Sequence, residues 1–257
     1  MKMCRFKQFG FTLVEMAIVL VIIGLLLGGM LMPLSAQIDQ RKISDTQKTL
    51  DEIKEALIGF AIANGRLPCP ALAATATGSV GAGLEATTGA GSTLACTNVA
   101  GVLPWATLGV NELDPWNHRY SYRVTLEFAR GATGQSIFTG TGCPPPTNPQ
   151  NAAFALCSQG NITILSAATG GSTVSSNVPA VVISHGKNGN GAYTSQGTQL
   201  ATSTDVDELD NQLTTGGTAT ANTNFVNKTP TATFDDLVSW VSASILFNRM
   251  VAAGKLP

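Results

Sequence analysis

The N-terminal segment constrains this chain most, because a short basic leader is followed by an uninterrupted apolar run. Lys2, Arg5 and Lys7 lie in the leader, and no charged residue occurs at 16–34. Counted over 11–34 and at ~1.5 Å per residue, a helix is longer than a hydrocarbon core of ~30 Å. The pattern predicts a membrane-spanning helix at 11–34, with the basic end in the cytoplasm and everything after residue 34 outside.

Three interpretations of this segment compete. The first is a plain transmembrane anchor. The second is a secretory signal that is cleaved between Ala36 and Gln37. Against the signal, the apolar run is longer than the ~7–15 residues usual for a signal core. A carboxylate, Glu15, also lies at the very edge of the run.

The third interpretation comes from a resemblance. Residues 10–15 read Gly-Phe-Thr-Leu-Val-Glu and are followed by an apolar string that reaches Gly24. With the basic leader, they resemble the prepilin cleavage and methylation segment of type IV pilins and type II secretion pseudopilins. The resemblance implies that a prepilin peptidase cuts after Gly10 and that the new N-terminus, Phe11, is methylated on its amine. A helix-bending proline usually lies one position before Pro33 in that family, so the position of any break stays open.

The charge of Glu15 requires an explanation, because it lies at the edge of a predicted membrane-spanning segment. An ionised carboxylate at membrane depth costs on the order of 2.5–3.5 kcal/mol and requires a partner. The amine of Phe11 lies four residues away on the same helix, where we expect poor geometry. The amine of a neighbouring subunit, staggered along a filament axis, is the better partner, and the resemblance gives the matching glutamate this role. The alternative is that Glu15 only extends to the lipid headgroups.

The resemblance also implies a division of the chain and a set of partners. Residues 1–10 are the cleaved leader, 11–34 the transmembrane or filament-core helix, and 35–257 a periplasmic pilin-like domain. The chain is expected to cross the bacterial inner membrane once and to enter a filament after assembly. Its partners are the lipid bilayer, the prepilin peptidase, an inner-membrane assembly platform and other pilin or pseudopilin subunits. A net charge of -1, with 12% charged residues, indicates no nucleic-acid partner.

Cysteine usage agrees with an extracytoplasmic domain. Cys4 lies in the leader, and four cysteines follow the apolar run: Cys69, Cys96, Cys143 and Cys157. An even number in an oxidising compartment indicates two disulfides. Of the three possible pairings we favour Cys69–Cys96 with Cys143–Cys157, because each closes a short loop. A zinc site is the alternative, but no pair has the Cys-x-x-Cys spacing.

The helix is predicted to continue beyond residue 34 with an amphipathic pattern. Its apolar stripe comprises Ile43, Leu50, Ile53, Leu57 and Phe60. The stripe must be buried, and a sheet of the same chain is the simplest partner. We expect the helix to end near Asn64-Gly65. The predicted fold is therefore α+β and pilin-like: a long N-terminal helix packed on a small antiparallel sheet with long loops.

The remainder shows short apolar segments between polar tracts. Alternating or β-branched residues predict strands at 119–128, 162–165, 179–184 and 236–241, and a helix is predicted at 243–252. Residues 71–101 are read as a loop pinned between two cysteines, and 129–160 and 194–233 as mainly loop. Turns are expected at 103–105 and 114–117.

The sequence offers little for catalysis. Its two histidines, His118 and His185, belong to no recognisable triad signature, and the chain is predicted to be a structural protein without a cofactor. The runner-up is a periplasmic binding module or hydrolase that residues 1–36 tether or export.

Residues 184–189 resemble a segment that precedes a calcium-binding acidic loop in major pseudopilins. The nearest acids here are Asp205, Asp207, Glu208 and Asp210, with a different spacing. We assign no metal to them.

Overall fold

The computed structural model describes residues 10–131, 152–215, 218–219, 222–231 and 233–256. For residues 27–35, 92, 214–215 and 218–219 it describes the backbone alone. The chain forms two compact units, Met1–Ser44 and Asp45–Pro257.

The first unit contains the beginning of helix α1 (Leu13–Asn64), which continues through Pro33. Large apolar side chains between Phe11 and Leu26 are exposed on every side of this part of the helix. Among the side chains that the structure describes, no helix offers a stretch of the length and apolarity that a membrane crossing requires. The side chains of 27–34, the last part of the apolar run, lie outside that description.

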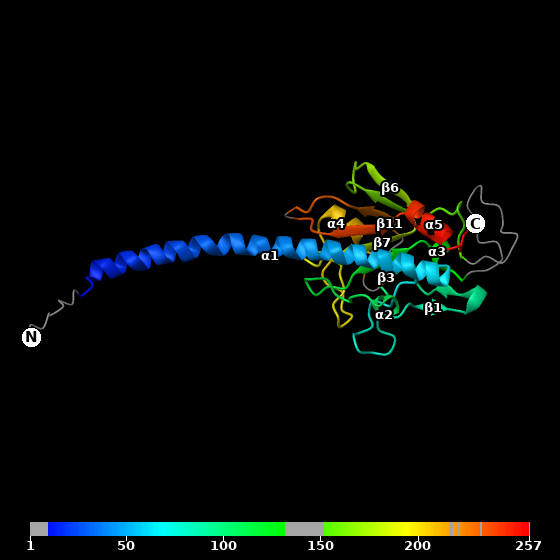
Figure 1. Cartoon of the computed structure of the whole chain (residues 1–257), viewed down its shortest axis with the longest axis horizontal. Helices are drawn as coiled ribbons and strands as arrows, with labels where there is room; N and C mark the ends of the chain where they lie inside the picture. The colour runs from blue at the N-terminus through cyan, green and yellow to red at the C-terminus, as the bar shows by residue number, and fades with distance from the viewer. Residues whose placement is uncertain (1–9, 132–151, 216–217, 220–221, 232, 257) are drawn as a thin grey trace, which may run out of the picture. The chain divides into compact units, whose positions relative to one another are not determined.

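The second unit contains the amphipathic end of α1. Leu50, Ile53 and Leu57 are at most 4% exposed, so these members of the predicted stripe face the interior of this unit. Phe60 is half-buried, and Ile43 lies in the first unit and is half-buried as well. Figure 1 shows this part of α1 lying along the strands β7 and β11. The helix ends at Asn64, and Gly65 adopts a left-handed conformation with φ 71° that only glycine takes without strain. The predicted helix end is confirmed.

A four-stranded antiparallel sheet lies against this part of α1. Its strands follow in the order β11-β7-β4-β3. They are β3 (Ala100–Val102), β4 (Ser121–Val124), β7 (Ala180–Ser184) and β11 (Leu237–Val241). Both central strands, β4 and β7, are buried along their whole length, which agrees with the continuous apolar character of β7. The α+β, pilin-like prediction for the fold is confirmed.

A second sheet of three strands flanks the first. It has the order β10-β5-β6 and comprises β5 (Ile162–Leu165), β6 (Thr173–Val178) and β10 (Asn224–Val226). Strands β10 and β5 are parallel, a pairing that the sequence did not predict. Ile162, Ile164 and Phe225 of this sheet share a core cluster with Val181 and Ile183 of β7.

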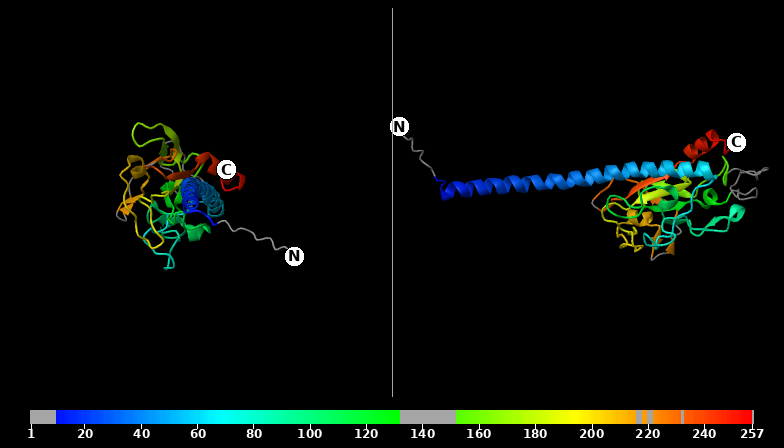
Figure 2. Two further views of the ribbon diagram at one scale, coloured as in Figure 1. Left: turned by 90° about the vertical axis from the view of Figure 1, so that its left-hand side faces the viewer. Right: turned by 60° about the horizontal axis from the view of Figure 1, so that its bottom comes forward.

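The smaller elements complete the second unit. They are the hairpins β1 (Thr87–Thr88) with β2 (Ala95–Cys96) and β8 (Thr214–Thr215) with β9 (Thr218–Ala219), the 3₁₀ turn η1 (Gly91–Thr93), and the helices α2 (Trp105–Leu108), α3 (Leu126–Ala129), α4 (Val206–Asn211) and α5 (Ala243–Ala252). Helix α5 lies beside the end of α1, as the right-hand view of Figure 2 shows, and Arg249 reaches Glu55 at 3.4 Å.

The prediction of one strand over 119–128 is wrong in its second half. Strand β4 ends at Val124, and α3 begins at Leu126. The ring of Phe128 packs 4.8 Å from the ring of Phe154 and 6.1 Å from that of Phe247. These contacts come from distant segments, so tertiary packing overrides the local alternation.

The loop predicted over 194–233 is also only partly correct, because it contains α4 and β10. Helix α4 begins where the Asp205 side chain accepts a hydrogen bond from the Asp207 amide at 2.9 Å. An acid at the helix cap and Glu208 three residues later form a recognisable start signal. The sequence therefore held a sign of this helix that the prediction missed.

Candidate processing and assembly segment

The predicted cleavage point lies just outside the first helix. Gly10 and Phe11 precede α1, which begins at Leu13, and Phe11 is 81% exposed. The helix starts at this point because Thr12 caps it. The Glu15 amide donates to the Thr12 hydroxyl at 3.3 Å, while the Thr12 amide donates to the Glu15 carboxylate at 2.8 Å. This reciprocal pair is a capping box, which satisfies two amides that a helix start otherwise leaves without a partner.

The carboxylate of Glu15 has a defined position within this box. Its Oε2 atom accepts from the Thr12 amide and also from the Thr12 hydroxyl, at 2.9 Å. A negative charge in the first turn is also favoured by the dipole of the helix. The group that the sequence assigned to assembly therefore lies on the first turn, next to the predicted new N-terminus.

Residues 5–31 match the family model of the prokaryotic N-terminal methylation motif. This motif is consistent with the N-terminus of type IV pilins and pseudopilins, as the sequence interpretation expected. The match contains Gly10, Phe11 and Glu15, the residues on which the sequence interpretation depends. Neither the curated proteins nor the solved structures contain a match to the chain.

One of the two predicted disulfides is present. Cys69 and Cys96 are bonded, with their Cα atoms 5.2 Å apart. Cys157 is disulfide-bonded too, whereas its predicted partner Cys143 lies outside the described residues, so that pairing stays a prediction. The Cys69–Cys96 bond joins the segment after α1 to hairpin β1–β2. The loop predicted over 71–101 is only partly correct, because it contains this hairpin, η1 and the start of β3.

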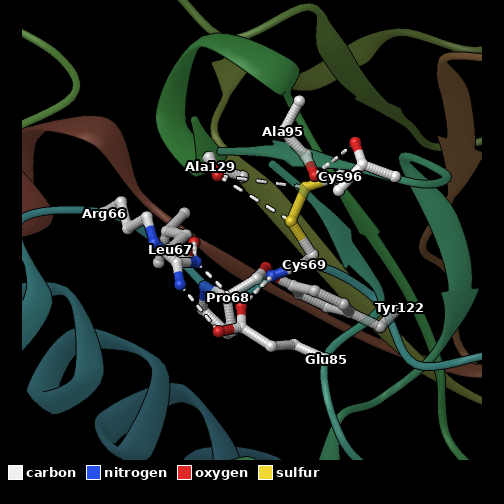
Figure 3. Close-up of a disulfide and its surroundings, with 10 residues drawn as sticks. Arg66, Leu67, Pro68, Cys69, Glu85, Ala95, Cys96, Tyr122 and Ala129 are labelled. Carbon is white, nitrogen blue, oxygen red and sulfur yellow. Dashed lines mark hydrogen bonds and ion pairs between the residues drawn. A yellow bond between two sulfur atoms is a disulfide. The ribbon is translucent and has the colours of Figure 1, made fainter. Parts of the chain in front are cut away.

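An ion pair reinforces the same junction. Figure 3 shows the Arg66 guanidinium facing the Glu85 carboxylate beside Cys69. The two N···O contacts measure 2.6 and 2.8 Å, and Glu85 also accepts from the Cys69 amide at 3.1 Å. Two parallel bonds from arginine to a carboxylate fix geometry as well as adding energy. The segment between Cys69 and Cys96 is therefore held by the disulfide at its ends and, at Glu85, by the ion pair with Arg66.

A second cluster of chemically active side chains lies in the second unit and was not predicted as a cluster. Carboxylate oxygens of Glu208, Asp235 and Asp236 lie within 4.8 Å of one another. Of the four acids that the sequence singled out, Glu208 alone belongs to it. The aspartates directly precede β11 and lie far from Glu208 in the sequence, so only the sheet brings them together.

Glu208 organises the loops around this cluster. Its Oε1 accepts from the Asn188 side-chain amide at 2.7 Å, and its Oε2 accepts from the Ser203 hydroxyl at 2.6 Å and the Asn190 side chain at 3.2 Å. These bonds tie the Asn-Gly loop after β7 to α4. Burial, together with the charges of Glu208 and Asp236, raises the pKa of the Asp235 carboxyl group to about 6. Chemically, such a group of oxygens suits a proton or a hard cation such as Ca²⁺.

The histidines take structural positions. The Ser121 hydroxyl lies 2.8 Å from Nε2 of His185, and Nδ1 of His185 lies 3.4 Å from Oδ1 of Asp236. This resembles the order of groups in a hydrolase triad. However, Ser121 is 3% exposed and His185 is 0% exposed, so a substrate does not reach either group in this structure. His118 directly follows the turn predicted at 114–117, and its Nδ1 lies 3.1 Å from the Gly186 carbonyl oxygen.

Proposed function

We propose that the chain is a structural subunit of a type IV pilus or of a type II secretion-type pseudopilus. In this proposal prepilin peptidase cleaves it after Gly10, and Phe11 is methylated. The product polymerises through its N-terminal helix. The observation that carries the proposal is the methylation motif at 5–31. The helix start at Leu13 supports it, because the Gly10–Phe11 bond lies outside the hydrogen-bonded helix and a peptidase acts on extended backbone.

The proposal also accounts for the apolar surface of the first helix. Leu13, Leu20 and Leu25 are 87, 65 and 73% exposed. Apolar surface on all sides of a helix requires an apolar environment. We propose that this environment is the inner membrane before assembly and the helices of neighbouring subunits afterwards. In this scheme residues 11–34 form the span, residues 35–257 lie in the periplasm, and an inner-membrane assembly platform transfers the subunit to the filament.

Removing the carboxylate of Glu15 tests the proposed filament function directly. We expect Glu15→Ala to be inserted and cleaved normally but to leave most subunits in the membrane, since the amine of a neighbouring Phe11 loses its counter-charge. The measurement is the ratio of sheared filament to membrane-bound subunit. Glu52→Ala is the matched control, because Glu52 is an exposed carboxylate of the same helix outside the apolar run. Equal assembly of Glu15→Ala and wild type would contradict the proposal.

The competing function is a binding module or hydrolase tethered or exported by residues 1–36. Among the described residues, the Ser121–His185–Asp236 arrangement is the most specific support for a hydrolase. However, all three side chains are buried, which argues against catalysis by them. The pilin-type motif instead indicates a non-enzymatic subunit. An ordinary export signal would leave Gln37 as the first residue, whereas the filament proposal requires Phe11.

A further inference from the structure

In the capping box, the two oxygens of the Glu15 carboxylate differ in their hydrogen-bond partners. Both donors of Thr12, its amide and its hydroxyl, converge on Oε2. Within the described part of the chain, no hydrogen bond to Oε1 is recorded. One oxygen is thus held by the chain's own helix start, and the other keeps its accepting capacity.

We propose that Thr12 is a positioning residue for assembly: it fixes Glu15 through Oε2, so that Oε1 receives the amine of a second copy of this chain. The inference rests on the proposed function, because it assigns the occupant of Oε1 from the pairing proposed there. Thr12 itself contacts no partner in this scheme and acts only through Glu15.

The physical reason is preorganisation. A glutamate side chain has three rotatable bonds, and without a partner it samples several rotamers. At the edge of an apolar run it also has the option of extending to the headgroups. The two bonds from Thr12 keep the carboxylate on the first turn, where the positive end of the helix dipole favours it. Fixing a group in its bound position before association removes an entropic cost from association.

Thr12→Val tests the hydroxyl, because valine has nearly the same shape and lacks the oxygen. A capping side chain typically changes an equilibrium about five-fold. We therefore expect Thr12→Val to lower the ratio of sheared filament to membrane-bound subunit about five-fold, counting only subunits that mass spectrometry shows to be cleaved. Thr12→Ser keeps the hydroxyl and is expected to assemble as wild type does. Unchanged or increased assembly of Thr12→Val would overturn the inference.

A second measurement does not depend on filaments. In the cleaved full-length subunit embedded in lipid nanodiscs, we expect amide hydrogen exchange at residue 12 to be several-fold faster in Glu15→Ala than in wild type. Thr12→Val combined with Glu15→Ala is expected to add nothing further, because the valine acts through the same carboxylate. Equal exchange in wild type and Glu15→Ala would show that the box does not form. If exchange responds but Glu15→Ala assembles normally, the box exists and the proposed function fails instead.

Discussion

At the scale of single residues, buried acids set the pH response of the second unit. Asp235 is half-buried beside Glu208 and Asp236, and its pKa is raised to about 6. In the unfolded chain the pKa of an aspartate is close to 3.9. Between these values the folded chain binds more protons than the unfolded chain, so stability falls as pH rises from about 4 to about 6. Above about pH 6 Asp235 is ionised in the folded and the unfolded chain, so its unfavourable contribution to stability no longer changes with pH.

Asp235→Asn removes the half-buried negative charge. It keeps an oxygen that can accept from the Asn188 backbone amide, a bond of 2.8 Å in the wild type. We expect it to raise the free energy of unfolding by about 1 kcal/mol at pH 7.5, after allowance for solvent screening of a half-buried group. This corresponds to a Tm increase of ~2–4 °C, with little change at pH 4. Thermal unfolding at both values of pH measures it. Asp51→Asn, at an exposed position of α1, is the control, and a pH-independent gain would disprove this account.

At the scale of elements, the amphipathic end of α1 depends on its buried stripe. Leu57 is 0% exposed, so Leu57→Ala removes buried surface and leaves a cavity. We expect a loss of about 2–4 kcal/mol of unfolding free energy, measured by urea denaturation. Gln47→Ala on the exposed face of the same helix is expected to change it by less than about 0.5 kcal/mol. Similar small effects at both positions would mean that the stripe does not hold the helix.

The disulfide gives a second prediction for an element. Cys69 and Cys96 are separated by 27 residues. Replacing both by serine releases this loop in the folded and the unfolded chain, and we expect unfolding free energy to fall by about 3 kcal/mol. Chemical denaturation of the double variant against wild type measures the loss. The Arg66–Glu85 pair keeps one contact across the junction, so we expect the variant to fold. A stability equal to that of wild type would contradict the role given to this bond.

Elements with a strong local signal were predictable, and those formed by distant contacts were not. Strand 162–165 and helix 243–252 were predicted at the observed bounds, because apolar periodicity and flanking polar residues mark them. Helix α3 was missed because Phe128 is positioned by two aromatic rings from other segments. The parallel pairing of β10 with β5 joins segments far apart in the chain, and no local pattern encodes it.

The candidate site divides in the same way. Gly10, Phe11 and Glu15 form a contiguous motif, and the sequence alone pointed to all three. The capping box was readable too, since threonine with glutamate three residues later is a helix-start signal, but its use of one carboxylate oxygen required coordinates. The cluster of Glu208, Asp235 and Asp236 required the folded sheet, because 27 residues separate Glu208 from Asp235 along the chain.

At the scale of the whole molecule, the second unit and the apolar start of α1 differ in how their apolar side chains are covered. The second unit buries a core of its own between its sheets and the amphipathic end of α1. The described apolar side chains at the start of α1 remain exposed. The proposed function resolves this difference, since lipid and then neighbouring helices supply the apolar surroundings. Processing is the step on which the scheme depends, because only a free amine at Phe11 provides the charge that Glu15 requires.

The mass of the mature N-terminal peptide tests this central claim most directly. Protein isolated from sheared filaments and from membranes should be digested and its first peptide measured. We predict that the peptide begins at Phe11 and carries one additional methyl group. A first residue of Met1 or Gln37 would contradict the account.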